Sequence, residues 1–294
     1  MYLVLLFLSI LPVFLLGNYI YKNDFDKEPT KLIFKLFFFG IASAFLTLLI
    51  SNVLIRIFPM LGADPAELDI IRLIPYTFIG VALVEEFSKW IFVYLSTYRG
   101  NEFNHAYDGI VYAAFVSLGF ACFENVLYVL GTMEISTAVM RALLAVPGHL
   151  CDAIFMGYFL ALAKISDKNN NPELSKKNKI KSLIVPVVTH GIYDYLLFAS
   201  SFIGITVVIF FIFVVFVFNK AIDIVGQMKR LRMDISSSFN PRFNINPYPY
   251  ANQNVDYNYN SQLFSNPNVV ANYCNVCGAK RRGMYCSNCG KKYF

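Results

Sequence analysis

Charged residues are scarce in this sequence of 294 residues: Asp, Glu, Lys and Arg together make up 15% of the chain, whereas apolar residues make up 57%. A soluble domain has no need for long stretches that are almost free of charge. A helix that crosses roughly 30 Å of hydrocarbon needs about twenty such residues in a row. The scarcity of charge therefore argues against a soluble protein and predicts a membrane protein.

Seven stretches are long and apolar enough for membrane-spanning helices. They cover approximately residues 2–21, 33–55, 70–97, 107–131, 138–163, 180–200 and 202–219, and the fifth and seventh are the least clearly delimited. The first stretch lacks a preceding basic region and a small-residue cleavage site, so we expect a retained span and not a signal peptide. The sequence predicts an all-α polytopic membrane domain over residues 1–222, with about seven to eight transmembrane helices.

Lys and Arg are unequally distributed between the two sets of loops. One set has only Arg56, Arg72 and Arg141. The other set has fifteen, namely Lys22, Lys27, Lys31, Lys35, Arg99, Lys164, Lys168, Lys176, Lys177, Lys179, Lys181, Lys220, Lys229, Arg230 and Arg232. Because cytoplasmic loops are enriched in Lys and Arg, this asymmetry predicts an N-terminus outside the cell and a C-terminus in the cytoplasm. The net charge of +6 then needs no nucleic-acid partner, since these residues face anionic lipid.

The composition changes near the C-terminal end. Residues 223–272 are predicted to be a cytoplasmic linker of low complexity, rich in Asn, Pro and Tyr from about residue 236; an adhesive Asn/Tyr-rich segment is the alternative. Residues 273–294 contain two CxxC motifs, which supply Cys274, Cys277, Cys286 and Cys289. This spacing predicts a closed structural Zn²⁺ site in a zinc ribbon, and a cytoplasmic location argues against disulfides. Neighbouring Lys and Arg residues favour either a cytoplasmic partner or the inner-leaflet lipid.

A few polar residues interrupt the predicted spans. They are Glu85, Glu86 and Lys89 on the third, Glu124 and Asn125 on the fourth, Arg141, His149 and Asp152 on the fifth, and His190 and Asp194 on the sixth. An ionised side chain at mid-membrane costs several kcal/mol unless it is paired or hydrated. Most of these residues fall at a similar depth, which predicts one shared site.

Pairing within this set is expected to be incomplete. Glu85 and Lys89 are four residues apart and can form an ion pair, whereas Glu86 is expected to point about 100° away on the helix. Taken singly, each polar residue could equally serve helix packing. Taken together, three glutamates and two histidines with a single basic partner cannot all be neutralised, so part of the cluster should face water or substrate.

Such a cluster is suited to hydrolysis. Adjacent carboxylates shielded from water repel each other, so one of them can exchange a proton near neutral pH. A nearby histidine can hydrogen-bond the same water or stabilise the oxyanion of a tetrahedral intermediate. We therefore expect glutamate-activated water to cleave a peptide bond without a covalent intermediate.

The segments EEFSK, FACFEN and HGIYD resemble motifs of the PrsW family of glutamic-type intramembrane proteases, which is similar to the CAAX- and bacteriocin-processing membrane endopeptidases. The resemblance covers about residues 1–220. It implies that Glu85 and Glu86 are the paired glutamates, one of them the general base, and that His190 and Asp194 are the final motif pair. The matches at other positions are Lys89 in EExxK, Glu124 in FxxxE where prenyl-processing relatives have His, His149 between the motifs, and Asn125 as a supporting residue. It further implies a membrane-anchored substrate, such as an anti-sigma factor.

Three alternatives to a metal-free peptidase remain. Two Glu and two His are also a plausible catalytic zinc set, but the sequence has no HExxH motif and Lys89 would repel a cation, so we expect no metal in catalysis. A proton-coupled transporter would gather the same residue types, yet no convincing internal repeat is present. A non-catalytic scaffold or sensor with a zinc-ribbon tail is the third alternative.

Overall fold

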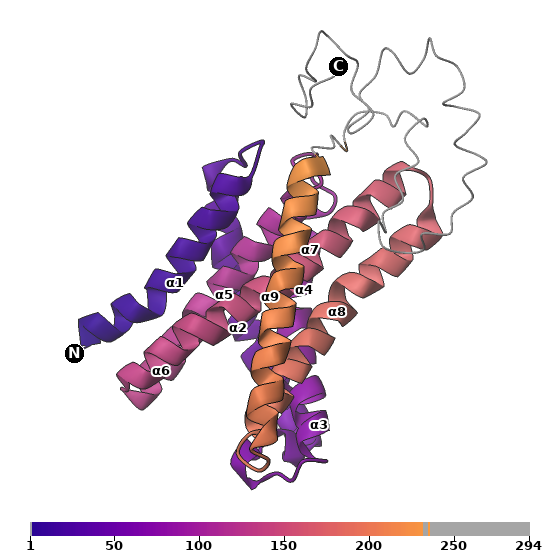
Figure 1. Ribbon diagram of the computed structural model, residues 1–294. Coiled ribbons are helices and arrows are strands. Elements are labelled where there is room, and N and C mark those ends of the chain that lie inside the picture. The colour runs from indigo at the N-terminus through magenta and orange to yellow at the C-terminus, as the bar shows by residue number, and fades with distance from the viewer. Residues whose placement is uncertain (1, 232–234, 236–294) are drawn as a thin grey trace, which may run out of the picture. The chain divides into compact units, whose positions relative to one another are not determined.

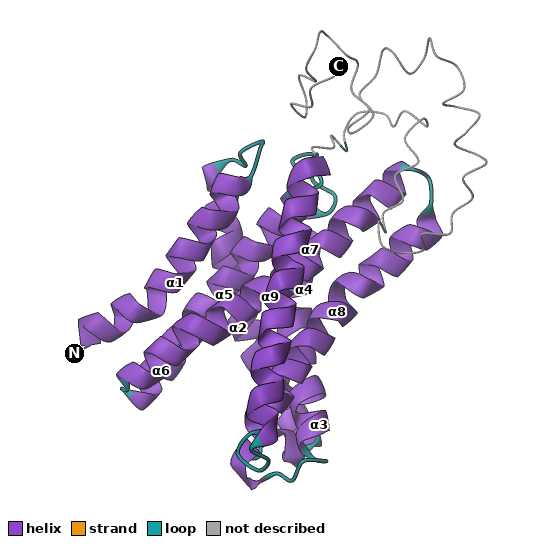
Figure 2. Cartoon of the chain, viewed as in Figure 1, coloured by secondary structure: helices purple, strands orange, loops and turns teal. Residues whose placement is uncertain are grey.

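The computed structural model describes residues 2–231 and 235, and all of its regular structure in that part of the chain is helical (Figures 1 and 2). The first half contains α1 (Tyr2–Asn23), α2 (Thr30–Ile57), η1 (Pro59–Gly62), η2 (Pro65–Glu67), α3 (Leu73–Pro75), η3 (Tyr76–Leu83) and α4 (Val84–Thr97). The second half contains α5 (Asp108–Thr132), α6 (Ile135–Met140), η4 (Arg141–Ala145), α7 (Val146–Lys168), α8 (Pro172–Ala199) and α9 (Ile205–Leu231). The predicted all-α polytopic fold is confirmed.

Six helices in the described residues are long and apolar enough to cross a membrane, compared with the seven spans predicted. They are Tyr2–Asn23, Thr30–Ile57, Asp108–Thr132, Ile135–Lys168, Pro172–Ala199 and Ile205–Arg230. The remaining prediction, 70–97, corresponds to α3, η3 and α4, which follow one another without a break. In this run a π-helical segment is followed closely by three charged residues, Glu85, Glu86 and Lys89.

Helix α5 lies at the centre of the bundle, where it contacts α1, α2, α4 and α7. Its glycines allow two of these neighbours to approach closely. A Cβ atom on Gly119 would collide with the backbone of α2 at Phe37, and Gly109 faces the backbone of Gly157 on α7. The close approach at Gly109 packs α5 against α7, and the close approach at Gly119 packs α5 against α2.

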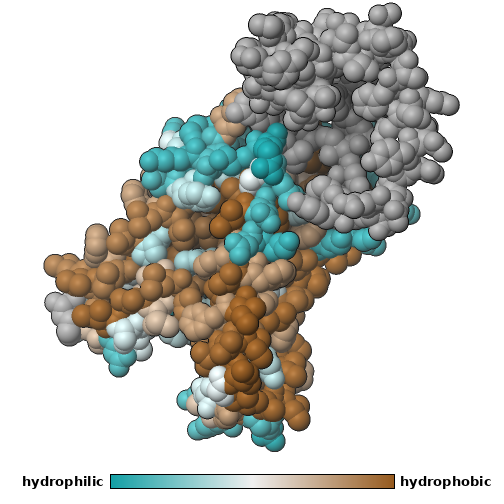
Figure 3. Space-filling model, viewed as in Figure 1, coloured by the Kyte–Doolittle hydropathy of each residue, from teal (hydrophilic) through white to brown (hydrophobic). Residues whose placement is uncertain are grey.

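Apolar side chains cover the outside of the bundle. Large exposed residues include Leu3, Phe14, Ile71, Leu95 and Ile212, whose side chains are more than 60% accessible. Figure 3 shows an apolar surface over the body of the bundle, with polar residues gathered toward its ends. This distribution suits a lipid environment, since a soluble protein rarely exposes apolar patches of such extent.

The end of the predicted membrane domain is helical beyond residue 222, because α9 continues to Leu231. Most of the predicted linker and the cysteines of the predicted zinc ribbon lie outside the described residues. The boundaries proposed for those two segments therefore stay predictions.

Candidate active site

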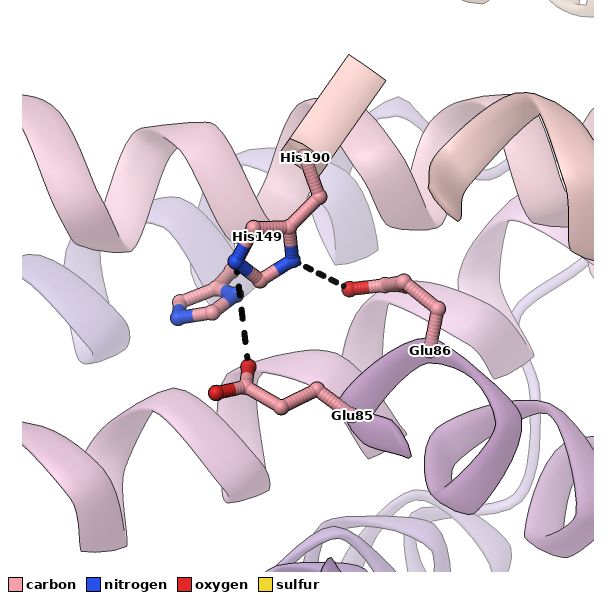
Figure 4. Close-up of side chains that lie close together, drawn as sticks. All are labelled: Glu85, Glu86, His149 and His190. Atoms are coloured by element: carbon pink, nitrogen blue, oxygen red, sulfur yellow. Dashed lines mark hydrogen bonds and ion pairs between the residues drawn. The ribbon is translucent and has the colours of Figure 1, made fainter. Parts of the chain in front are cut away.

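Three helices bring the predicted site residues together in the interior of the bundle. Glu85 and Glu86 lie in the first turn of α4, His149 lies near the start of α7, and His190 lies in the second half of α8. One nitrogen or oxygen atom from each of these side chains lies within 4.8 Å of the others, and all four residues are buried. Figure 4 shows the His190 ring in contact with both carboxyl groups and the His149 ring beside it.

Lys89 lies between the carboxylates and is only 1% exposed. Its Nζ lies 2.6 Å from Glu86 Oε1 and 3.6 Å from Glu85 Oε2. The sequence pattern predicted a pair with Glu85 alone and placed Glu86 on another face; this expectation was incomplete, because residues three apart on a helix are also neighbours. The Lys89 ammonium also lies 4.2 Å from the centre of the Phe120 ring. Lys89 thus holds both glutamates on one side of the site.

His190 is surrounded by carboxyl groups from three helices. Its Nδ1 lies 2.9 Å from Glu86 Oε1 and 3.9 Å from Asp152 Oδ2, and its Nε2 lies 3.4 Å from Asp194 Oδ2 and 3.9 Å from Glu85 Oε2. Both ring nitrogens therefore face acceptors, so each can donate a proton.

His149 links this group to a second cluster on α5 and η4. Its Nδ1 lies 3.1 Å from Lys89 Nζ, and its Nε2 lies 2.9 Å from Glu124 Oε2. The same Glu124 oxygen lies 2.7 Å from Arg141 Nη2. Arg141 Nε in turn donates to Asn125 Oδ1 at 2.9 Å. All the residues predicted for the site are thus joined in one polar network, although their catalytic roles stay a prediction.

Two members of the network were not among the predicted site residues. Arg141, near the start of the fifth predicted span, was counted with the adjoining loop, but it lies within the helical run from Ile135 and its ion pair with Glu124 makes it a second basic partner. The expectation of one basic partner is therefore wrong. Asp152 accepts a hydrogen bond of 2.5 Å from Thr189 Oγ1 and lies beside His190. Both residues carried the signal that identified the others, a charge inside an apolar stretch.

Acidic groups still outnumber basic ones in this network. Five carboxyl groups, from Glu85, Glu86, Glu124, Asp152 and Asp194, face two cations and two histidines. Burial opposes an uncompensated negative charge, so a proton or another cation must be shared within the group. A buried cluster that can hold and release protons is suited to acid–base chemistry.

One protein family and several individual proteins are similar to this chain over the range that contains the network. The family described as "PrsW family intramembrane metalloprotease" matches residues 28–219, a range that contains the whole network. Protease PrsW of Geobacillus kaustophilus is 37% identical over 189 residues, which are 64% of this chain and 77% of that protein. Protease PrsW of Bacillus subtilis is 34% identical over 198 residues, which are 66% of this chain and 82% of that protein. No solved structure matches the chain.

These matches favour a peptidase over the transporter and scaffold alternatives. The matched range begins at residue 28 and ends at residue 219, so it leaves out the Cys-rich tail. The residues that carried the resemblance in the sequence are the residues that the fold gathers in its interior. The chain therefore belongs to the PrsW family of intramembrane proteases and is a membrane-embedded peptidase.

Proposed function

We propose that the protein hydrolyses a peptide bond of a membrane-anchored protein with a water molecule activated by Glu85. The observation that carries this proposal is the state of the two glutamates. Glu86 is fully buried, and its Oε1 is held by both Lys89 and His190. Glu85 is 10% exposed at its side chain, and its Oε2 is buried without a hydrogen-bond partner. Oε2 of Glu86 lacks a hydrogen-bond partner too, so the two glutamates differ in exposure and in their short contacts. Glu86 Oε1 has two contacts shorter than 3 Å, whereas the ion-pair contacts of Glu85 Oε2 are 3.6 and 3.9 Å, which makes Glu85 the more accessible and less tightly held carboxylate.

The chemical step is a general-base hydrolysis. The water oxygen attacks the carbonyl carbon of the scissile peptide while Glu85 takes the water proton. The tetrahedral oxyanion then collapses, the C–N bond breaks, and the proton held by Glu85 passes to the leaving nitrogen. No covalent bond to the protein forms at any point.

The neighbours of Glu85 have supporting roles in this proposal. His190 Nε2, 3.9 Å from Glu85 Oε2, is the donor for the developing oxyanion, and it turns to that oxyanion from Asp194 Oδ2, which lies 3.4 Å away, while Glu86 Oε1 holds the ring at Nδ1. Glu86 fixes Lys89 and His190 by its two short contacts. Glu124 orients His149 by its contact of 2.9 Å with Nε2.

The orientation in the membrane follows from the basic residues. Contacts tie the basic segments to one end of the bundle: Lys229 Nζ donates to Asn23 Oδ1 at 2.6 Å, and Lys179 and Tyr98 both contact Asp167. One contact joins the ends of α1 and α9, and the other two join the end of α7 to the end of α4 and to the first half of α8; these segments carry many of the fifteen basic residues. In our proposal this end is cytoplasmic and the N-terminus lies outside.

The substrate and the tail complete the proposal. The resemblance noted in the sequence points to an anti-sigma factor, or a similar membrane-anchored signalling protein, as substrate. Cys274, Cys277, Cys286 and Cys289 would bind a structural zinc ion in the cytoplasm, since four thiolates leave no open coordination position. The basic residues of this tail would engage either a cytoplasmic partner or anionic lipid.

A catalytic metal is the second candidate, and the donor set of the site favours it. The donor set fits a zinc ion in residue type and mutual distance; it consists of Glu85, Glu86, His149 and His190. A bound cation would also offset the excess of negative charge in the network. A zinc ion there would supply an acidic bound water and polarise the scissile carbonyl. Lys89, however, already contacts Glu86 Oε1 and His149 Nδ1, so two of the four ligands face an ammonium group. For this reason we retain the metal-free proposal.

The proposal is tested by comparing the membrane proteins of cells that carry the wild-type chain with those of cells that carry Glu85→Gln. The amide is isosteric but cannot take the water proton, so we expect an intact membrane protein to accumulate and its cleaved fragment to disappear. Glu67→Gln, which changes an exposed glutamate of η2, is the matched control and should leave the fragment pattern unchanged. Identical fragments with Glu85→Gln would show that another group is the base.

A further inference from the structure

The contacts of Arg141 within the network all lie on one helix, α5. Its Nη2 contacts Glu124 Oε2 at 2.7 Å, its Nε donates to Asn125 Oδ1 at 2.9 Å, and its guanidinium lies 4.1 Å from the centre of the Tyr128 ring. Asn125 in turn donates to the backbone oxygen of Ser9 on α1 at 2.8 Å. Arg141 thus connects η4, the segment just before α7, to α5 and through it to α1.

The contacts on the two sides of His149 fix the position of its proton. The Lys89 ammonium, 3.1 Å from Nδ1, can only donate, so Nδ1 must be the acceptor. The single proton of a neutral ring then sits on Nε2 and is donated to Glu124 Oε2 at 2.9 Å. That oxygen also accepts from Arg141, which favours its charged form.

We propose that Arg141 is a positioning residue, which holds Glu124 as a carboxylate and thereby keeps the His149 proton on Nε2. This inference rests on the proposed function, because it concerns the same site. If the proton moved to Nδ1, it would face the Lys89 ammonium, and no hydrogen bond could form because both groups would be donors. Lys89 would then turn toward Glu85 Oε2, now 3.6 Å away, and occupy the oxygen that receives the water proton.

The test measures the protonation of His149 directly, without a substrate. The chain has only three histidines, so full-length protein labelled with ¹⁵N-histidine in detergent micelles gives few signals. His105→Gln and His149→Gln assign them. We expect the wild-type protein to show His149 with an unprotonated Nδ1 and a protonated Nε2. In Arg141→Gln the separate unprotonated Nδ1 signal should be lost.

Two further variants separate positioning from simple packing. Glu124→Gln combined with Arg141→Gln removes both charges and leaves an amide oxygen that can accept from Nε2, so the wild-type signals should return. Arg141→Lys keeps the charge but not the bond to Asn125, and it should also keep these signals. If Arg141→Gln fails to fold, loss of the wild-type His149 signals in Arg141→Lys or in the double variant overturns the inference instead. Arg72→Gln, which opens an exposed ion pair with Asp69, is the control that should change nothing.

The inference is overturned by an unchanged His149 spectrum in Arg141→Gln, or by a changed spectrum that the double variant does not restore. Cleavage by Arg141→Gln should fall about 10- to 100-fold, as for other residues that orient an active-site ligand. Glu85→Gln is measured beside it. If Glu85→Gln retained activity, the proposed role of Glu85 as general base would be wrong. The spectra would still test the positioning role of Arg141 separately.

Discussion

At the scale of single residues, the site buries charged groups that would be unstable there without partners. Lys89 is almost completely buried, and its partners Glu86 and His149 occupy the ammonium group from two helices. Removal of one partner of such a buried pair typically costs about 3–5 kcal/mol, because the other charge is left uncompensated. Lys89 therefore stabilises the bundle and shapes the site at the same time.

Glu28 is a buried residue outside the spans, and its carboxyl group predicts that the stability of the fold depends on pH. Glu28, between α1 and α2, is 5% exposed and accepts a hydrogen bond of 2.8 Å from the Tyr112 hydroxyl. Burial is the main cause that raises the pKa of Glu28 to about 7, and Asp24, Glu102 and Asp26 add repulsion. The folded protein thus binds this proton more tightly than the unfolded chain, so stability is highest at low pH and falls as the pH rises from about 4.5 to about 7.

Glu28→Gln should abolish this decrease. We expect the variant to match the wild type near pH 4.5 and to be more stable at pH 8 by roughly 1–2 kcal/mol, since the amide carries no charge to bury. Thermal unfolding in detergent micelles at both pH values measures the difference. Glu67→Gln, at an exposed carboxyl group, should show no gain at pH 8. An equal loss of stability at both pH values would contradict this account.

At the scale of helices, the close contacts of α5 hold the site together. Glu124 on α5 contacts His149 on α7, and the same two helices pack closely at Gly109 and Gly157. The π-helical segments η3 and η4 lie directly before the stretches that carry Glu85 and His149. Such segments change the face on which the following residues lie, and they are frequent at functional sites.

A methyl group on the α5 interface should destabilise the bundle. Gly119→Ala places a Cβ against the carbonyl oxygen of Phe37, a backbone atom that cannot rotate away, so we expect a loss of about 1–3 kcal/mol. Gly131→Ala is the matched control on the same helix, because a Cβ there meets nothing within 4 Å. Its stability should be unchanged or slightly higher, as Ala favours helix. Equal melting temperatures for the two variants in micelles would refute the close approach.

The sequence predicted the helices and the site to different degrees. Charge-free stretches located six helices, and polar residues at one depth identified Glu85, Glu86, His149 and His190 as neighbours. Arg141 was missed because it lies near the start of the fifth predicted span and was counted with the adjoining loop, and because its contact with Glu124 joins two helices. The π-helical segments were missed too, since the expected period was that of an ordinary helix. Distances between helices cannot be read from periodicity.

At the scale of the whole molecule, the fold gathers acidic groups in an apolar bundle and basic groups at one end. Side chains from α4, α5, α7 and α8 form the interior site. The basic end is joined by contacts such as that between Lys229 and Asn23. This separation lets one chain hold a fixed orientation in the membrane while its reactive residues stay shielded from bulk water.

The central claim is that a glutamate of the chain, and not a metal ion, activates the water. The most direct measurement is the rate at which purified full-length protein in micelles cleaves the membrane protein identified by the Glu85→Gln comparison, before and after removal of metal with a strong chelator. We predict a rate within about twofold of the untreated protein, against a decrease of about 10²- to 10⁴-fold for Glu85→Gln. Loss of cleavage on chelation, with recovery on addition of zinc, would contradict the account.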